Sequence, residues 1–129
     1  MTGDRPRTPP AERFDVGSLV LDLAAEVASL RAEPGGARHG HRQKTLYKHG
    51  GRTLALFVME AGAVLPEHAA AGTVSVQPIE GEILMRVAGA ESRLAPGHVM
   101  VMPPRVRHDV RAETPAAFLL QVSLGPGSP

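Results

Sequence analysis

Charged and apolar residues alternate without a break between positions 105 and 113. The odd positions hold Arg, Arg, Asp, Arg and Glu, and the even positions hold Val, His, Val and Ala. Successive side chains of a β-strand point to opposite faces, so this pattern predicts a strand with one buried and one solvated face. The apolar face carries His108 together with Val106, Val110 and Ala112. The alternation therefore predicts that this imidazole points into the interior of the protein.

Short strands are predicted along most of the chain after residue 43. A second alternating segment places Ile83, Met85 and Val87 on one face. Turn residues separate the segments, and no helical period lies between them. The predicted strands cover residues 44–48, 53–59, 73–79, 82–88, 99–102, 106–112 and 116–123. Many short strands at close spacing are typical of an all-β sandwich or closed barrel, here with an aliphatic interior.

The residues before the strands predict one helix and two irregular segments. Asp15 is a candidate N-cap, and the apolar residues that follow it recur at intervals of four and three. This stripe consists of Val16, Val20, Leu23, Val27 and Leu30. We expect a flexible tail at 1–13, an amphipathic helix at 14–32, a loop at 33–43, a barrel at 44–124 and a second tail at 125–129. The helix is expected to pack on its own barrel rather than on a partner.

Charge and cysteine content exclude several classes of function. The 129 residues fit one domain, and a formal net charge of +1 leaves no excess of basic residues to bind nucleic acid. Cysteine is absent, so a metal would need His or carboxylate ligands. The polar N-terminus is not typical of a secretory signal, and no apolar run is long enough to span a membrane. These observations predict a cytoplasmic protein with no nucleic-acid or membrane partner.

Two segments resemble the two sequence motifs of the cupin family. The first runs from Gly62 to Gly81 and contains the sequence PEH, which ends at His68. The second runs from Gly97 to His108, with the motif spacing retained throughout. The resemblance covers nearly all of the predicted barrel. It implies a small antiparallel double-stranded β-helix, the jelly-roll barrel of single-domain RmlC-like cupins, and makes a homodimer the expected assembly.

Only half of the metal-binding positions of these motifs are retained. Metal-binding cupins hold iron, manganese, nickel or zinc with two histidines and a glutamate of the first motif and one histidine of the second. His68 and His108 match two of these positions, whereas Ala70 and Val74 stand at the other two. Catalytic metal sites generally use three protein ligands, so the resemblance implies a weak or absent metal at the two histidines. Glu67 should face away from its neighbour in a regular strand, and its recruitment as a ligand requires a bulge.

The turn ahead of the second histidine also departs from the motif. Arg105 stands where the motif usually has a glycine. This replacement puts the tightness of the turn in question. The strand prediction is unaffected, because the alternating pattern continues after it.

Three classes of function are compatible with these residues. The first is a small-molecule binding protein without a tight cofactor, in which an aliphatic barrel encloses the ligand and two histidines anchor it. The expected contact residues are His68, Ala70, Val74, Met85, His108 and Val110. The second is an enzyme: either a divalent-metal-dependent oxygenase, isomerase or lyase with both histidines as ligands, or a metal-free catalyst with one histidine as general base. The third is a regulatory or assembly role, with the barrel as a dimerisation scaffold.

Overall fold

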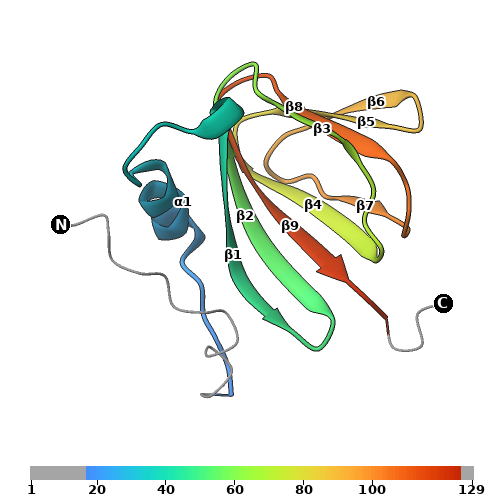
Figure 1. The fold of residues 1–129 in the computed structure, drawn as a ribbon, viewed down its shortest axis with the longest axis horizontal. Helices are drawn as coiled ribbons and strands as arrows, with labels where there is room; N and C mark the ends of the chain where they lie inside the picture. Colours follow the sequence, from blue (N-terminus) through green and yellow to red (C-terminus); the bar gives the residue numbers. More distant parts are fainter. Residues whose placement is uncertain (1–16, 126–129) are drawn as a thin grey trace.

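The structure is a computed structural model that describes residues 17–125, in which one α-helix and nine β-strands are found (Figure 1). The helix α1 spans Leu23–Arg31, and a short 3-10 turn, η2, spans Arg38–Gly40. The strands in chain order are β1 (His41–His49), β2 (Arg52–Met59), β3 (Val64–His68), β4 (Thr73–Glu80), β5 (Ile83–Val87), β6 (Ala90–Leu94), β7 (Met100–Met102), β8 (His108–Ala112) and β9 (Ala116–Ser123).

The strands form two antiparallel sheets that face each other (Figure 1). The larger sheet has the order β1-β2-β9-β4-β7, and the smaller sheet has the order β3-β8-β5-β6. Strands β2 and β9 are neighbours although six strands lie between them in the chain, and β3 and β8 are neighbours although four strands lie between them. This jelly-roll topology confirms the predicted all-β double-stranded β-helix with one helix before it.

Two of these strands are absent from the sequence prediction. β3 contains Pro66, which has no backbone N–H to donate, and β6 has the mostly polar sequence AESRL. The proline is tolerated because β3 is an edge strand of the smaller sheet, with a neighbour on one side alone. A third difference concerns β1, which begins at His41 inside the predicted loop. Residues 41–43 are extended because they pair with the end of β2.

The helix is shorter than the sequence predicts. It begins at Leu23 rather than near residue 14, because Asp22 is its N-cap and accepts a hydrogen bond from the backbone N–H of Ala25 at 3.0 Å. Val20 lies ahead of this cap and is 93% exposed, so it is not part of the buried stripe. The stripe is reduced to the residues that contact the sheet, chiefly Val27 and Leu30.

Some predictions concern residues outside the described range. The tail at 1–13, the candidate cap Asp15 and all but the first residue of the tail at 125–129 lie there. Within the described range, no helix is long and apolar enough to cross a membrane.

The strands β2 and β9 are buried on both faces. On β2, Phe57 and Met59 contribute to the core between the two sheets, whereas Leu56 and Val58 contact a second cluster under α1. The helix therefore packs on the outer face of its own barrel, as its amphipathic pattern predicts. Lys44 on β1 forms a partly buried ion pair with a helix carboxylate, with 2.8 Å between Nζ and Oε1 of Glu26.

Gly81 allows the turn between β4 and β5 to lie close to the turn between β8 and β9. Gly81 lies between β4 and β5 with φ +76°, in the left-handed region that favours glycine. A Cβ at this position would lie 2.1 Å from the carbonyl oxygen of Pro115, in the turn between β8 and β9. Any other residue would push these two turns apart.

The packing of α1 yields a first prediction. Leu30 is fully buried between the helix and the sheet, so Leu30→Ala is expected to lower the free energy of unfolding by about 2–4 kcal/mol through lost burial and a residual cavity. Val20→Ala is the control, with an expected change below about 0.5 kcal/mol because the side chain is exposed. Urea denaturation followed by circular dichroism measures both. A Leu30→Ala protein as stable as the unsubstituted chain would contradict the packing of the helix on the sheet.

Candidate functional site

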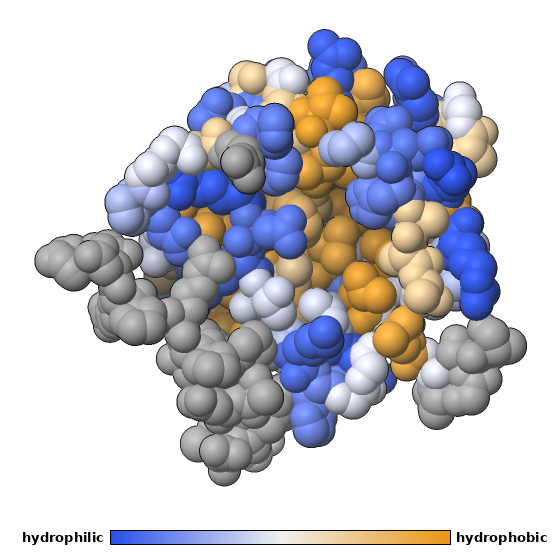
Figure 2. Space-filling view, in the orientation of Figure 1, coloured by the Kyte–Doolittle hydropathy of each residue, from blue (hydrophilic) through white to orange (hydrophobic). Residues whose placement is uncertain are grey.

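A cavity of about 420 Å³ lies between the two sheets. We call it the lumen cavity. Its walls come from β1, β2, β4 and β9 of the larger sheet and from β3 and β8 of the smaller sheet. Apolar side chains gather in the centre of the face shown in Figure 2, between polar borders. The lining residues are Gln43, Phe57, Leu65, Pro66, Glu67, His68, Val76, His108, Val110, Phe118 and Leu120.

The strand β8 places His108 on the wall of this cavity. The side chain is 2% exposed and is the one buried polar residue of the described part of the chain. It shares its face with Val110 and Ala112, which are also buried, as the alternation predicts. The Nδ1 atom lies 3.1 Å from the carbonyl oxygen of Val106. This bond satisfies one ring nitrogen of the buried side chain.

A bulge in β3 brings His68 to the same place. Leu65 pairs with Val110, and the next recorded pair is His68 with His108, so three steps along β3 match two steps along β8. In a regular strand, residue 67 rather than residue 68 would share the inner face with Leu65. The extra residue turns His68 inward, and the two imidazoles meet with 4.3 Å between ring centroids and 60° between ring planes.

His68 lines the lumen cavity but is more exposed than His108. The prediction places both histidines in the interior, but the His68 side chain is exposed and lies at the mouth of the lumen cavity. The cause is its position at the end of an edge strand, where β8 covers one side alone. The imidazole of His108 is therefore buried, and that of His68 is in contact with solvent.

The hydrogen bonds of the two rings fix which nitrogen is available. His68 Nδ1 lies 2.9 Å from the carbonyl oxygen of Pro66, as His108 Nδ1 lies 3.1 Å from that of Val106. A carbonyl oxygen can only accept, so each Nδ1 carries the proton and donates. In the neutral ring the lone pair is then on Nε2. Each imidazole can use this atom to accept a hydrogen bond, take up a proton or bind a metal ion.

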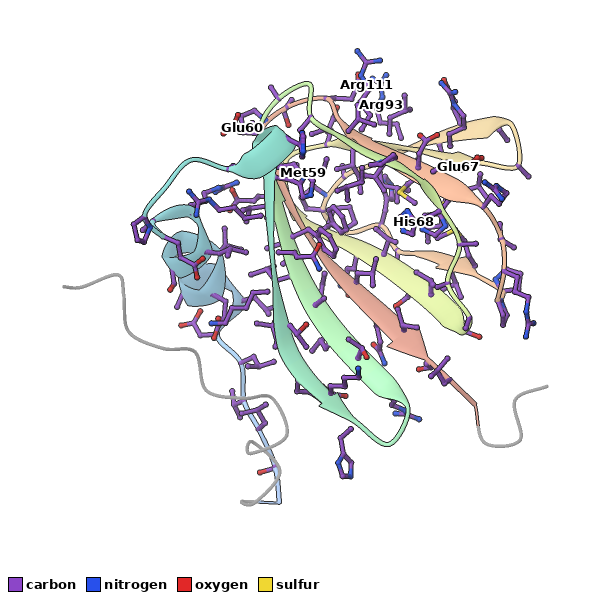
Figure 3. The ribbon with its side chains drawn as sticks, in the orientation of Figure 1. Met59, Glu60, Glu67, His68, Arg93 and Arg111 are labelled. Carbon is purple, nitrogen blue, oxygen red and sulfur yellow. The ribbon has the colours of Figure 1, made fainter. Side chains whose placement is uncertain are left out.

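Glu67 lies beside His68 but is engaged elsewhere. Its Oε1 lies 3.2 Å from Nε of Arg107, in an ion pair between β3 and the turn before β8. In Figure 3, His68 lies between the two sheets and Glu67 lies nearer the rim of the smaller sheet. The bulge that the sequence required for recruitment of Glu67 is present, but it brings the neighbouring histidine to the site instead.

The other predicted contact residues are divided between the cavity and the core. Val110 lines the lumen cavity. Val74 and Met85 are buried in the core between the sheets, and Ala70 packs against that core. None of these three is among the residues that line the cavity.

Sequence reasoning missed the aromatic part of the wall. Phe57 on β2 and Phe118 on β9 are a cross-strand pair whose rings stack in parallel, with 4.9 Å between centroids and 2° between planes. Both rings line the lumen cavity. The chain has only three phenylalanines, and two of them lie on predicted strands. The small number of phenylalanines, two of them on predicted strands, was the only signal in the sequence. The contact between the two rings depends on the register of β2 and β9, which are distant in sequence.

The residues at the site do not fit a tightly bound metal ion. No group of three or more His, Asp or Glu side chains that could hold a metal occurs within residues 17–125. Two imidazoles supply fewer protein ligands than catalytic metal sites generally have. The side chains of Ala70 and Val74 cannot ligate, and the carboxylate of Glu67 is paired with Arg107.

A second cavity of about 400 Å³ lies outside the barrel, beside the connection from α1 to β1. Glu60, labelled in Figure 3, is part of its wall. Two arginines also line it, but Arg31 is paired with Glu80, and Arg42 donates to the carbonyl oxygen of Gly35. These guanidinium groups already contact protein partners. The lumen cavity, where the two imidazole rings meet, is the candidate functional site.

The turn before His108 keeps a glycine-like conformation without a glycine. Arg105 has φ +67°, in the left-handed region, and its backbone N–H donates to the carbonyl oxygen of Ala70 at 2.8 Å. This bond ties the turn before β8 to the segment after β3. The replacement of the motif glycine has therefore left the turn intact, at a cost in backbone strain.

This strain gives a second prediction. Arg105→Gly is expected to be more stable than Arg105→Ala by about 1 kcal/mol, because both variants lose the same side-chain contacts and only the alanine keeps a Cβ in the left-handed region. Thermal and urea unfolding measure the difference. At Arg107, which is not among the residues with positive φ, the matched pair should show no advantage for glycine. An alanine variant as stable as the glycine variant at position 105 would show that the turn is unstrained.

Comparison with known proteins identifies the fold. No family model matches the sequence, and no curated protein matches it. Among solved structures, a conserved protein of unknown function from Streptococcus pyogenes aligns with a TM-score of 0.68 and 22% identity, over 84% of this chain and 90% of that chain. A cupin superfamily protein from Desulfitobacterium hafniense aligns with a TM-score of 0.65 and 16% identity, over 74% and 88% of the two chains. An RmlC-like cupin from Shewanella frigidimarina gives 0.63 and 22%, over 67% and 78%. With the jelly-roll topology described above, these similarities show that the chain has the cupin fold.

Proposed function

We propose that this protein binds a small molecule in the lumen cavity, with His68 and His108 as its polar anchors and without a tightly bound metal ion. The observation that carries the proposal is the pair of imidazoles in an otherwise mainly apolar cavity. Both rings bond to backbone carbonyls through Nδ1, which leaves two Nε2 atoms for a ligand. Such a combination of apolar walls and few convergent polar groups is the usual form of a ligand site.

The size of the cavity supports this proposal. Its volume of about 420 Å³ lies within the range that small-molecule sites occupy. Six aliphatic or aromatic side chains line it, so a ligand would gain most of its binding free energy from apolar contact. These six are Phe57, Leu65, Val76, Val110, Phe118 and Leu120.

The alternative is a divalent-metal-dependent enzyme that uses the same two histidines. One feature favours it: histidines that bind metals usually donate their second ring N–H to a carbonyl or carboxylate, as both rings do here. The shortage of ligands opposes it, because the positions of Ala70 and Val74 offer no donor atoms. Binding of a metal ion therefore separates the two candidate functions.

A third prediction follows. Purified protein is expected to contain far less than one equivalent of iron, manganese, nickel or zinc, and neither EDTA nor added zinc is expected to change its melting temperature. The reason is that a ligand stabilises a protein only when its concentration exceeds the dissociation constant for the folded state. Elemental analysis and thermal melting measure both quantities. One bound ion per chain, with a melting temperature that falls in EDTA, would support the metal-dependent enzyme instead.

A variant that restores the missing ligands is the matched control. Ala70→His combined with Val74→Glu supplies the two ligands of the cupin motif that this chain lacks. Val74 is 2% exposed, so the buried carboxylate is expected to lower stability in the absence of metal. Zinc is expected to restore stability to the double variant and to leave the unsubstituted protein unchanged. Equal responses in the two proteins would mean that the gap at these positions does not limit metal binding.

A further inference from the structure

We infer that the ligand of the lumen cavity is an uncharged aromatic molecule that donates a hydrogen bond, through a hydroxyl or N–H group, to Nε2 of the histidine pair. This inference rests on the proposed small-molecule function and adds the chemical class of the ligand. Three features of the cavity carry it: the hydrogen bonds of the imidazoles, the charge of the wall and the aromatic side chains of the apolar surface.

The first feature is that the histidine pair offers acceptors. Because a carbonyl oxygen holds the N–H of each ring, each neutral imidazole presents the lone pair of Nε2. His108 is 2% exposed, so bulk water has little access to compete for this acceptor. A ligand that brings an O–H or N–H group gains a hydrogen bond there. A ligand without one leaves a desolvated acceptor unpaired, which is unfavourable.

The second feature is the lack of cationic groups on the wall. No Lys or Arg is among the residues that line the lumen cavity, within the part of the chain that the structure describes. The nearby Arg107 does not line the cavity, and its guanidinium is paired with Glu67. An anionic ligand would lose hydration there without gaining an ion pair. The wall therefore favours an uncharged ligand.

The third feature is the aromatic wall opposite the histidines. Phe57 and Phe118 stack in parallel, 2° between their planes, and the smaller sheet supplies the imidazoles that face them. Aromatic rings attract one another in stacked or edge-to-face arrangements beyond the area that they bury. A flat ring that contacts this wall can direct its donor group towards the imidazoles. An aromatic alcohol or an N–H heterocycle meets all three conditions.

Three probes that share one ring system test the inference. They are 2-naphthol, which donates a hydrogen bond; 2-methoxynaphthalene, which does not; and 2-naphthoate, which is anionic. The chain has no Trp and a single Tyr, so naphthalene fluorescence reports binding with little background from the protein. We expect 2-naphthol to bind about three- to tenfold more tightly than its methyl ether, the gain of one buried hydrogen bond. We expect 2-naphthoate to bind more weakly than both.

Variants of the histidine pair assign the difference to Nε2. His108→Leu is expected to reduce the preference for 2-naphthol over its ether towards unity while binding of the ether persists. His68→Leu removes an exposed ring, so it tests the pair even if the buried replacement impairs folding. His98→Leu is the matched control, since His98 is exposed and does not line the cavity, and the preference should remain. A preference that survives in both His68→Leu and His108→Leu would overturn the inference.

The possible results also separate this inference from the proposed function. Shifts in the methyl NMR signals of Leu65, Val76 and Val110 show whether a probe enters the lumen cavity. If the ether or the naphthoate binds there as tightly as 2-naphthol, the ligand class is wrong and the binding function stands. If no probe shifts these signals, both the ligand class and the proposed function are contradicted.

Discussion

A β-strand presents successive side chains to opposite faces, and the larger sheet depends on strands that are buried on both faces. Phe57 and Met59 project towards the lumen, while Leu56 and Val58 project towards α1. The continuous apolar run of β2 is the direct result. Burial on the outer face keeps the sheet in place behind the cavity, and burial on the inner face makes the wall of the cavity hydrophobic. Both the position of the helix and the character of the site follow from this one periodicity.

Within that apolar interior, an imidazole needs a hydrogen-bond partner. His108 finds one in the carbonyl of Val106, two residues earlier in the chain, and His68 uses the carbonyl of Pro66 in the same way. These local bonds hold both rings in one tautomer without a carboxylate. The site is therefore organised by the backbone. In metal-binding cupins these motif positions hold a set of metal ligands. Here the site presents two hydrogen-bond acceptors, because the side chains of Ala70 and Val74 have no atom that can bind a metal.

Local patterns predicted those parts of the structure that depend on neighbouring residues. Alternation is enough to place His108 on the inner face, because the sequence of a single strand indicates which of its two faces is buried. The stacking of Phe57 on Phe118 could not be predicted, since it depends on the register between β2 and β9. The predicted start of the helix was wrong, because a second candidate N-cap, Asp22, lies within the apparent apolar stripe and caps the helix instead. The exposure of His68 could not be predicted from its motif, since exposure at a sheet edge is set by strand order.

The bulge in β3 has a wider consequence for how this site can change. An edge strand is held by a single ladder, so its alignment is less constrained than that of a central strand. A one-residue slip of β3 that removed the bulge would place Glu67, not His68, opposite His108. The same chain would then present a carboxylate–imidazole dyad, the arrangement of an acid–base catalyst, in place of two acceptors. On this scaffold, the alignment of one edge strand therefore decides which side chain stands opposite His108.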